Sequence, residues 1–217
     1  MTEEVKNILS AADTYHNMLA CYEYIKKFYT TLDKHLEYGE IGKKFLPISK
    51  NRIFVDSNDY ALYSKHPYSD WLSPWYGRFY VDNHHLSTNF SIDDHSVSQV
   101  THLIFAWLWI GCKDPLVPNA EHPECWIGVV ETQSSNPDAR IYDVADMIYK
   151  FLRIESSISE TPEGWVRGRL FPNDVGSQAS GFWELKRFPL KNISTPYDIH
   201  HCIVDPLTKK YDEISNR

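Results

Sequence analysis

The chain has 217 residues, of which 42% are hydrophobic and 24% are charged, so its composition argues against wholesale disorder and predicts a full hydrophobic core. Its net charge of −7 argues against broad binding to nucleic acids or anionic membranes, since both attract basic proteins. Four scattered cysteines without a CxxC pair argue against a disulfide framework or a zinc knuckle and favour a cytoplasmic protein with reduced thiols.

The charge is unevenly distributed along the chain. Residues 1–163 carry 14 Lys and Arg against 23 Asp and Glu, whereas residues 164–191 carry five basic residues against two acidic ones. This basic segment either binds an anion or forms ion pairs with acidic residues of the same domain, and we favour the second interpretation. The N-terminus lacks an apolar signal core, and the longest apolar run, 103–111, is too short to span a bilayer.

The first 38 residues predict a helix, because apolar residues recur at spacings of three and four. Gly39 is suited to end this helix, and Ser10 followed by Asp13 allows a break near residue 10. An unbroken helix would be roughly 50 Å long at about 1.5 Å per residue, so we expect it to be broken or partly docked on another subunit. Packing along the sheet of its own chain is favoured, and dimerisation is the main alternative. Its apolar stripe runs through Val5, Ile8, Leu9, Ala12, Tyr15, Leu19 and Tyr22 and, after a shift of phase, through Ile25, Phe28, Leu32 and Leu36.

From residue 50 the apolar pattern changes to a period of two, which predicts strands. A short hairpin is expected at 52–55 and 60–63, followed by an alternating strand at 75–82. Segment 100–110 is apolar on both faces and predicts a central strand; a buried helix is the alternative, but the β-branched and aromatic content favours the strand. A further strand is expected at 125–131 and a helix at 141–154.

The C-terminal part predicts two more strands, 164–171 and 181–188, joined by a polar turn. Residues 196–205 should form a helix that ends by Pro206, because Thr195, Pro196 and Asp198 make a typical helix start; a strand is the alternative. The complete pattern predicts an α+β fold, in which a long N-terminal helix or helix pair packs on a mixed, largely antiparallel sheet of about six or seven strands with two further helices. We divide the chain into a helical segment, 1–39, and a single α+β domain, 40–217.

The strand at 181–188 carries an arrangement that suggests catalysis. Glu184 and Lys186 should share one strand face, and Asp174 lies ten residues before Glu184. Two carboxylates can hold Mg²⁺ while an ammonium group stabilises the developing charge on a phosphate. One hypothesis is therefore a metal-dependent nuclease of the Asp…Glu-x-Lys type that acts on phosphodiesters, or a degenerate relative of one. In it, Asp174 and Glu184 are catalytic residues that bind the metal, and Lys186 is the third catalytic residue. Arg167 and Arg169 would bind the phosphate.

The same residues also have a purely structural explanation. Glu184 would pair with Arg167 or Arg169 across a solvent-facing strand ladder, and such a pair contributes about 0.2–1 kcal/mol. Asp174 lies in a predicted loop, and an Asp followed by Glu-x-Lys occurs often by chance. We favour this ion-pair interpretation over the nuclease.

Histidine supplies a second candidate site. Two pairs are adjacent in the sequence, 84–85 and 200–201, and adjacent side chains do not face one another on a helix or a strand. If residues 196–205 are helical, Asp198, His201 and Asp205 share one face that could bind a metal, although a helix face with a buffered histidine is favoured. Cys125 begins an apolar strand and is expected to be a buried, inert thiol.

Residues 68–76 form a loop rich in aromatic side chains, of which Trp71, Trp75 and Tyr76 are the candidate contacts to a partner; a lid over the core explains the same residues and is favoured. With no strong catalytic signature, we predict a non-catalytic protein that binds another macromolecule, most simply another protein, as an inhibitor, immunity factor or regulatory adaptor. We expect no cofactor. A homodimer through the N-terminal helix is the alternative assembly. Only the nuclease hypothesis requires Mg²⁺ as a cofactor and a nucleic acid as the binding partner.

Overall fold

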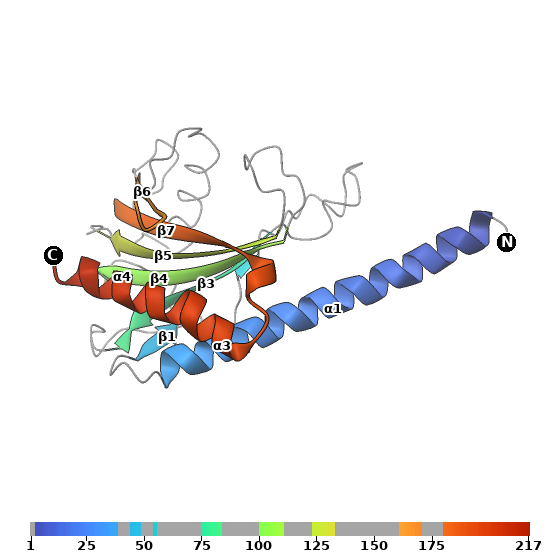
Figure 1. Ribbon diagram of the computed structural model, residues 1–217, viewed down its shortest axis with the longest axis horizontal. Coiled ribbons are helices and arrows are strands. Elements are labelled where there is room, and N and C mark those ends of the chain that lie inside the picture. Colours follow the sequence, from blue (N-terminus) through green and yellow to red (C-terminus); the bar gives the residue numbers. More distant parts are fainter. Residues whose placement is uncertain are drawn as a thin grey trace.

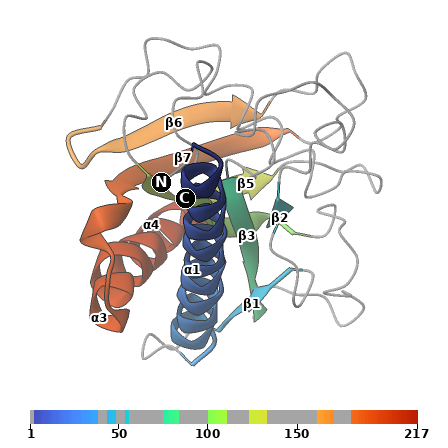
Figure 2. The same ribbon diagram turned by 90° about the vertical axis from the view of Figure 1, so that its right-hand side faces the viewer.

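The computed structural model describes residues 3–38, 44–48, 54–55, 75–83, 100–110, 123–132, 161–170 and 180–217. Within these ranges the chain forms an antiparallel sheet with helices packed against one of its faces (Figures 1 and 2). The predicted α+β class is therefore confirmed. Among these residues, no helix combines the length and the apolar character needed to cross a membrane.

In the described ranges the sheet has seven strands, which lie in the order β1-β3-β4-β5-β7-β6, with β2 also paired to β3. All of these pairings are antiparallel, so the expectation of a mixed sheet is not met in this part of the chain. The strands are β1 (Phe45–Pro47), β2 (Phe54–Val55), β3 (Trp75–Asp82), β4 (His102–Trp109), β5 (Glu124–Thr132), β6 (Trp165–Leu170) and β7 (Gly181–Pro189).

The central strands are buried on both faces, as their apolar sequences predict. The segment predicted at 100–110 forms β4, which is buried from Leu103 to Trp109, and the segment predicted at 125–131 forms β5. Residues 104, 106 and 108 of β4 belong to the core beneath the helices, whereas Phe105 and Trp107 are buried on the opposite face. This burial confirms the strand over the helix for segment 100–110.

The helices are α1 (Glu3–Glu37), η3 (Leu190–Asn192), α3 (Pro196–Ile199), η4 (His200–Val204) and α4 (Asp205–Ser215). Helix α1 is continuous, so the break considered near residue 10 is not present. The helix predicted at 196–205 is confirmed, but its predicted end at Pro206 is wrong, because Pro206 lies in the first turn of α4 and the helical segment continues to Ser215. The strand expected at 60–63 and the helix expected at 141–154 lie outside the described residues.

Polar contacts fix the C-terminal half of α1 to the sheet. The hydroxyl of Tyr29 donates to backbone carbonyls of β3 and β4, at 2.6 and 3.1 Å. Asp33 accepts hydrogen bonds from the guanidinium of Arg78 and, at 2.9 Å, from the hydroxyl of Tyr80. Burial raises the pKa of Tyr29 and Tyr80 well above the usual value, so both remain neutral donors. These contacts set the position of α1 on β3 and β4.

Candidate functional site

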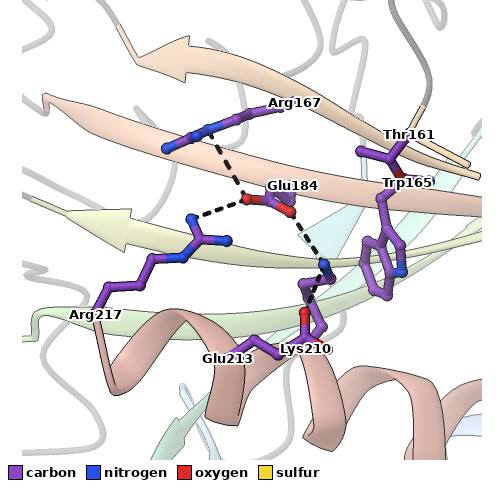
Figure 3. Close-up of polar contacts among 7 residues, drawn as sticks. All are labelled: Thr161, Trp165, Arg167, Glu184, Lys210, Glu213 and Arg217. Carbon is purple, nitrogen blue, oxygen red and sulfur yellow. Dashed lines mark hydrogen bonds and ion pairs between the residues drawn. The ribbon is translucent and has the colours of Figure 1, made fainter. Parts of the chain in front are cut away.

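Glu184 of β7 points toward α4, on the face of the sheet that the helices cover (Figure 3). It lies directly opposite Arg167 of β6 and Val129 of β5, and the residue is 5% exposed. The expectation that Glu184 faces solvent on the strand ladder is therefore wrong. Helix α4 covers this part of the sheet and buries the carboxylate.

Three cations surround the Glu184 carboxylate. Lys210 Nζ lies 3.3 Å from Oε2, while Arg217 Nη1 and Arg167 Nε lie 3.3 and 3.8 Å from Oε1. The ion pair expected between Glu184 and Arg167 is thus confirmed. Lys210 also contacts Glu213 at 2.8 Å, and its Nζ lies 5.0 Å from the centre of the Trp165 ring.

The cluster contains three basic side chains and two carboxylates. Burial disfavours the charged form of Lys210, but the carboxylates of Glu213 and Glu184 outweigh this effect and raise the pKa of its ammonium group. The cations come from β6, from α4 and from Arg217, which follows α4, so the cluster ties α4 to the sheet. A carboxylate that already faces three cations offers a divalent metal ion an unfavourable electrostatic environment.

Of the other residues of the nuclease hypothesis, Arg167 joins this cluster, whereas Lys186 and Arg169 lie against aromatic rings. Lys186 Nζ lies 5.4 Å from the centre of the Phe188 ring. The guanidinium groups of Arg167 and Arg169 both lie over the Phe182 ring, 4.9 and 5.1 Å from its centre. Asp174 lies outside the described residues.

Sequence reasoning missed Lys210, Glu213 and Arg217. Their spacing of three and then four residues would have placed them on one helix face, but the helix was expected to end at Pro206.

The aromatic residues expected to contact a partner are only partly described. Tyr76 is 6% exposed and packs beneath α1, where its ring lies edge-on to Tyr22 with centroids 6.1 Å apart. Trp75 is described by its backbone alone, as the first residue of β3, and Trp71 lies outside the described residues. In this structure Tyr76 therefore contributes to the core rather than to an exposed contact surface.

A second polar cluster lies at the junction of η4 and α4. His201 Nδ1 lies 2.7 Å from Asp205 Oδ2, and His200 Nδ1 lies 3.2 Å from Asp205 Oδ1. Of the three residues predicted to share a face, His201 and Asp205 meet, but Asp198 does not join them. Asp198 instead closes a capping box with Thr195, and hydrogen bonds from the backbone N–H and hydroxyl groups of Ser194 and Thr195 lower the pKa of its carboxyl group.

A π-turn explains why two adjacent histidines converge. The backbone N–H of Asp205 donates to the carbonyl of His200, five residues earlier, rather than to the carbonyl four residues earlier. In a regular α-helix only His201, at i−4, would face Asp205. The wider turn brings His200 to the same carboxylate, and the two imidazole rings lie 5.3 Å apart. The expectation that adjacent histidines do not face a common point is therefore wrong here.

The N-terminal half of α1 extends beyond the sheet (Figure 1). Leu19 and Tyr22 are 45% and 44% exposed, and Ile25 is the first buried residue among the described side chains of α1. The spacing explains this change. Leu19, Tyr22, Ile25 and Phe28 follow one another at intervals of three, and each interval falls about 60° short of a full helical turn. The apolar stripe therefore rotates away from the face that packs on the sheet.

Comparison with known proteins gave no relatives for this chain: no family model, no curated protein and no solved structure matches it.

Proposed function

We propose that this protein acts by binding another protein, and that the projecting half of α1 is the element that docks. The observation that carries this proposal is the exposure of Leu19 and Tyr22 on a helix segment that extends beyond the sheet (Figure 1). Single helices gain most of their stability in water by packing an apolar face. The chain's own core packs fully against α1 only from Ile25 onward, since Cys21 and Tyr24 are partly buried and Tyr22 contacts Tyr76 with one edge. A partner that covers the projecting segment would supply the missing packing.

The nature of this surface supports a protein partner. The segment from Asp13 to Glu23 combines exposed apolar side chains with acidic residues and a histidine, which suits a groove lined by apolar and basic side chains. A second copy of this chain is one such partner, as the homodimer alternative requires. An inhibitor, an immunity factor and a regulatory adaptor would all use the surface in this way. The cytoplasmic location inferred from the cysteines stays a prediction.

The nuclease hypothesis receives less support. It needs Glu184 to bind Mg²⁺ together with Asp174, and the cations of Lys210, Arg167 and Arg217 surround the Glu184 carboxylate. Binding of Mg²⁺ there would require these ion pairs to break. We therefore place the nuclease second.

Affinity purification from native cells, with quantitative mass spectrometry, tests the docking proposal. The variant is Leu19→Glu, which places a charge on the exposed stripe while keeping a strong helix former. Tyr38→Glu is the matched control, because Tyr38 is 76% exposed just beyond the other end of α1. We expect recovery of the partner to fall about 10-fold or more with Leu19→Glu, as for an interface anchor, and to stay unchanged with Tyr38→Glu.

Thermal unfolding followed by circular dichroism should be the same for both variants and the unaltered chain. Recovery of the same proteins in the same amounts with all three chains would overturn the proposal. A partner found to be the chain itself would identify the homodimer.

A further inference from the structure

The geometry points to a binding site for a divalent transition metal ion, formed by His200, His201 and Asp205 at the π-turn. This inference is independent of the docking function proposed for α1. One potential ligand atom from each of the three side chains lies within 4.8 Å of the other two. Two imidazoles and one carboxylate are a donor set that Zn²⁺, Ni²⁺ and Cu²⁺ prefer, whereas Mg²⁺ and Ca²⁺ prefer oxygen ligands alone.

The spacing of the donor atoms suits such an ion. Two ligands held at about 2.0–2.1 Å by a tetrahedral ion lie roughly 3.3–3.4 Å apart. His200 Nδ1 lies 3.2 Å from Asp205 Oδ1, and His201 Nδ1 lies 2.7 Å from the other oxygen, Oδ2. Small side-chain rotations would bring these separations to the values that a bound ion requires.

The backbone holds the three ligands in place. All three belong to one continuous helical segment, where the hydrogen bond from Asp205 N–H to His200 C=O closes the π-turn. Single π-turns occur frequently at functional sites, because the extra residue redirects a side chain. Here the redirected side chain is His200, which a regular α-helix would turn away from Asp205.

Neighbouring rings hold the imidazoles in orientation. The ring of His35, from α1, lies edge-on to His200 with centroids 5.2 Å apart, and the ring of Tyr197 lies edge-on to His201 at 4.0 Å. The side chains of His201 and Asp205 are 47% and 44% exposed, so an ion can enter from solvent. Three protein ligands also leave a coordination position for water or for an external group.

Isothermal titration of the tag-free protein with Zn²⁺ alone tests this site. The chain has ten histidines, so other sites contribute to the signal, and the comparison between variants isolates this one. We expect His201→Ala and Asp205→Asn each to weaken one binding event by at least about 10-fold or to remove it, since even residues that only orient a ligand commonly cost 10-fold or more. His16→Gln, which alters an exposed histidine on α1, should leave that event unchanged.

Three results would overturn the inference. The first is no binding of Zn²⁺ by the unaltered chain. The second is the same stoichiometry and affinity in the two site variants as in the unaltered chain. The third is an equal loss in His16→Gln. Circular dichroism spectra of the variants show that any loss comes from the missing ligand rather than from unfolding, and Asp205→Asn keeps the size and shape of the side chain if His201→Ala disturbs the helix.

Discussion

Glu184 illustrates how the surroundings of one residue decide between catalysis and structure. Its carboxylate is covered by α4 and faces cations that come from three places in the chain, Arg167, Lys210 and Arg217. Only Lys210 is itself largely buried, with its side chain 11% exposed, whereas the side chains of the two arginines are about half exposed. The pair with Lys210 should therefore contribute most, since exposed pairs are screened by solvent.

Replacing Glu184 by Gln should destabilise the protein by about 2 kcal/mol. Glutamine keeps the shape of the side chain but removes one of the two carboxylates that contact the buried ammonium group of Lys210. Of the described partners, only the Glu213 carboxylate then remains. Arg167→Gln is the control, because that pair is longer and half exposed, and should cost less than about 1 kcal/mol. Urea unfolding at neutral pH measures both values. Equal losses in the two variants would contradict the role assigned to the buried carboxylate.

At the scale of elements, α3, η4 and α4 form one continuous helical segment that carries both polar clusters. Its start is fixed by the capping box, in which the Thr195 hydroxyl accepts a hydrogen bond from the Asp198 N–H and the Asp198 carboxylate accepts one from the Thr195 N–H. The segment then passes through the π-turn and Pro206 before Lys210 reaches the sheet.

Thr195→Ala should destabilise the protein by about 1 kcal/mol, because it removes the side-chain acceptor of the cap. Ser194→Ala provides the comparison. The Ser194 hydroxyl also donates to Asp198, at 3.1 Å, but it lies outside the cap, and the backbone N–H of residue 194 still donates to the same carboxylate. Thermal unfolding measures both variants. A loss in Ser194→Ala as large as in Thr195→Ala would show that the cap is not the stabilising feature.

These elements also show what the sequence could and could not predict. Strands β4 and β5 were predictable because long apolar runs with β-branched and aromatic residues favour central strands. The start of α3 was predictable from its cap. The π-turn was not predicted, because Pro206 indicated the end of a helix rather than an irregular turn within a helix that continues to Ser215.

The same limit applies to the candidate sites. The pairing of Glu184 with Arg167 followed from strand alternation, but the contribution of Lys210 and Arg217 depends on a helix that packs across the sheet. His201 and Asp205 were placed together by helical spacing, and His200 joined them only through the π-turn. The sequence thus failed to predict two kinds of feature: contacts between segments that are distant along the chain, and irregular helical turns.

For the whole molecule, α1 has two halves with different environments. From Ile25 to Leu36 its apolar residues pack on the sheet, and Tyr29 and Asp33 bond to β3 and β4. Before Ile25 the described side chains are exposed or partly exposed, and Figure 1 shows this half extending away from the sheet. One half of the helix thus packs on the sheet, and the other half presents an exposed surface. This arrangement is expected of a helix that docks on a partner.

Hydrogen–deuterium exchange of α1 tests this central claim most directly, with the chain measured alone at low concentration and again in the complex recovered from native cells. Alone, peptides from 25–37 should exchange slowly and peptides from 13–22 quickly, because packing protects only the first set. In the complex, the account predicts new protection confined to 13–22. Equal exchange of 13–22 in the two samples, with a partner bound elsewhere, would contradict it.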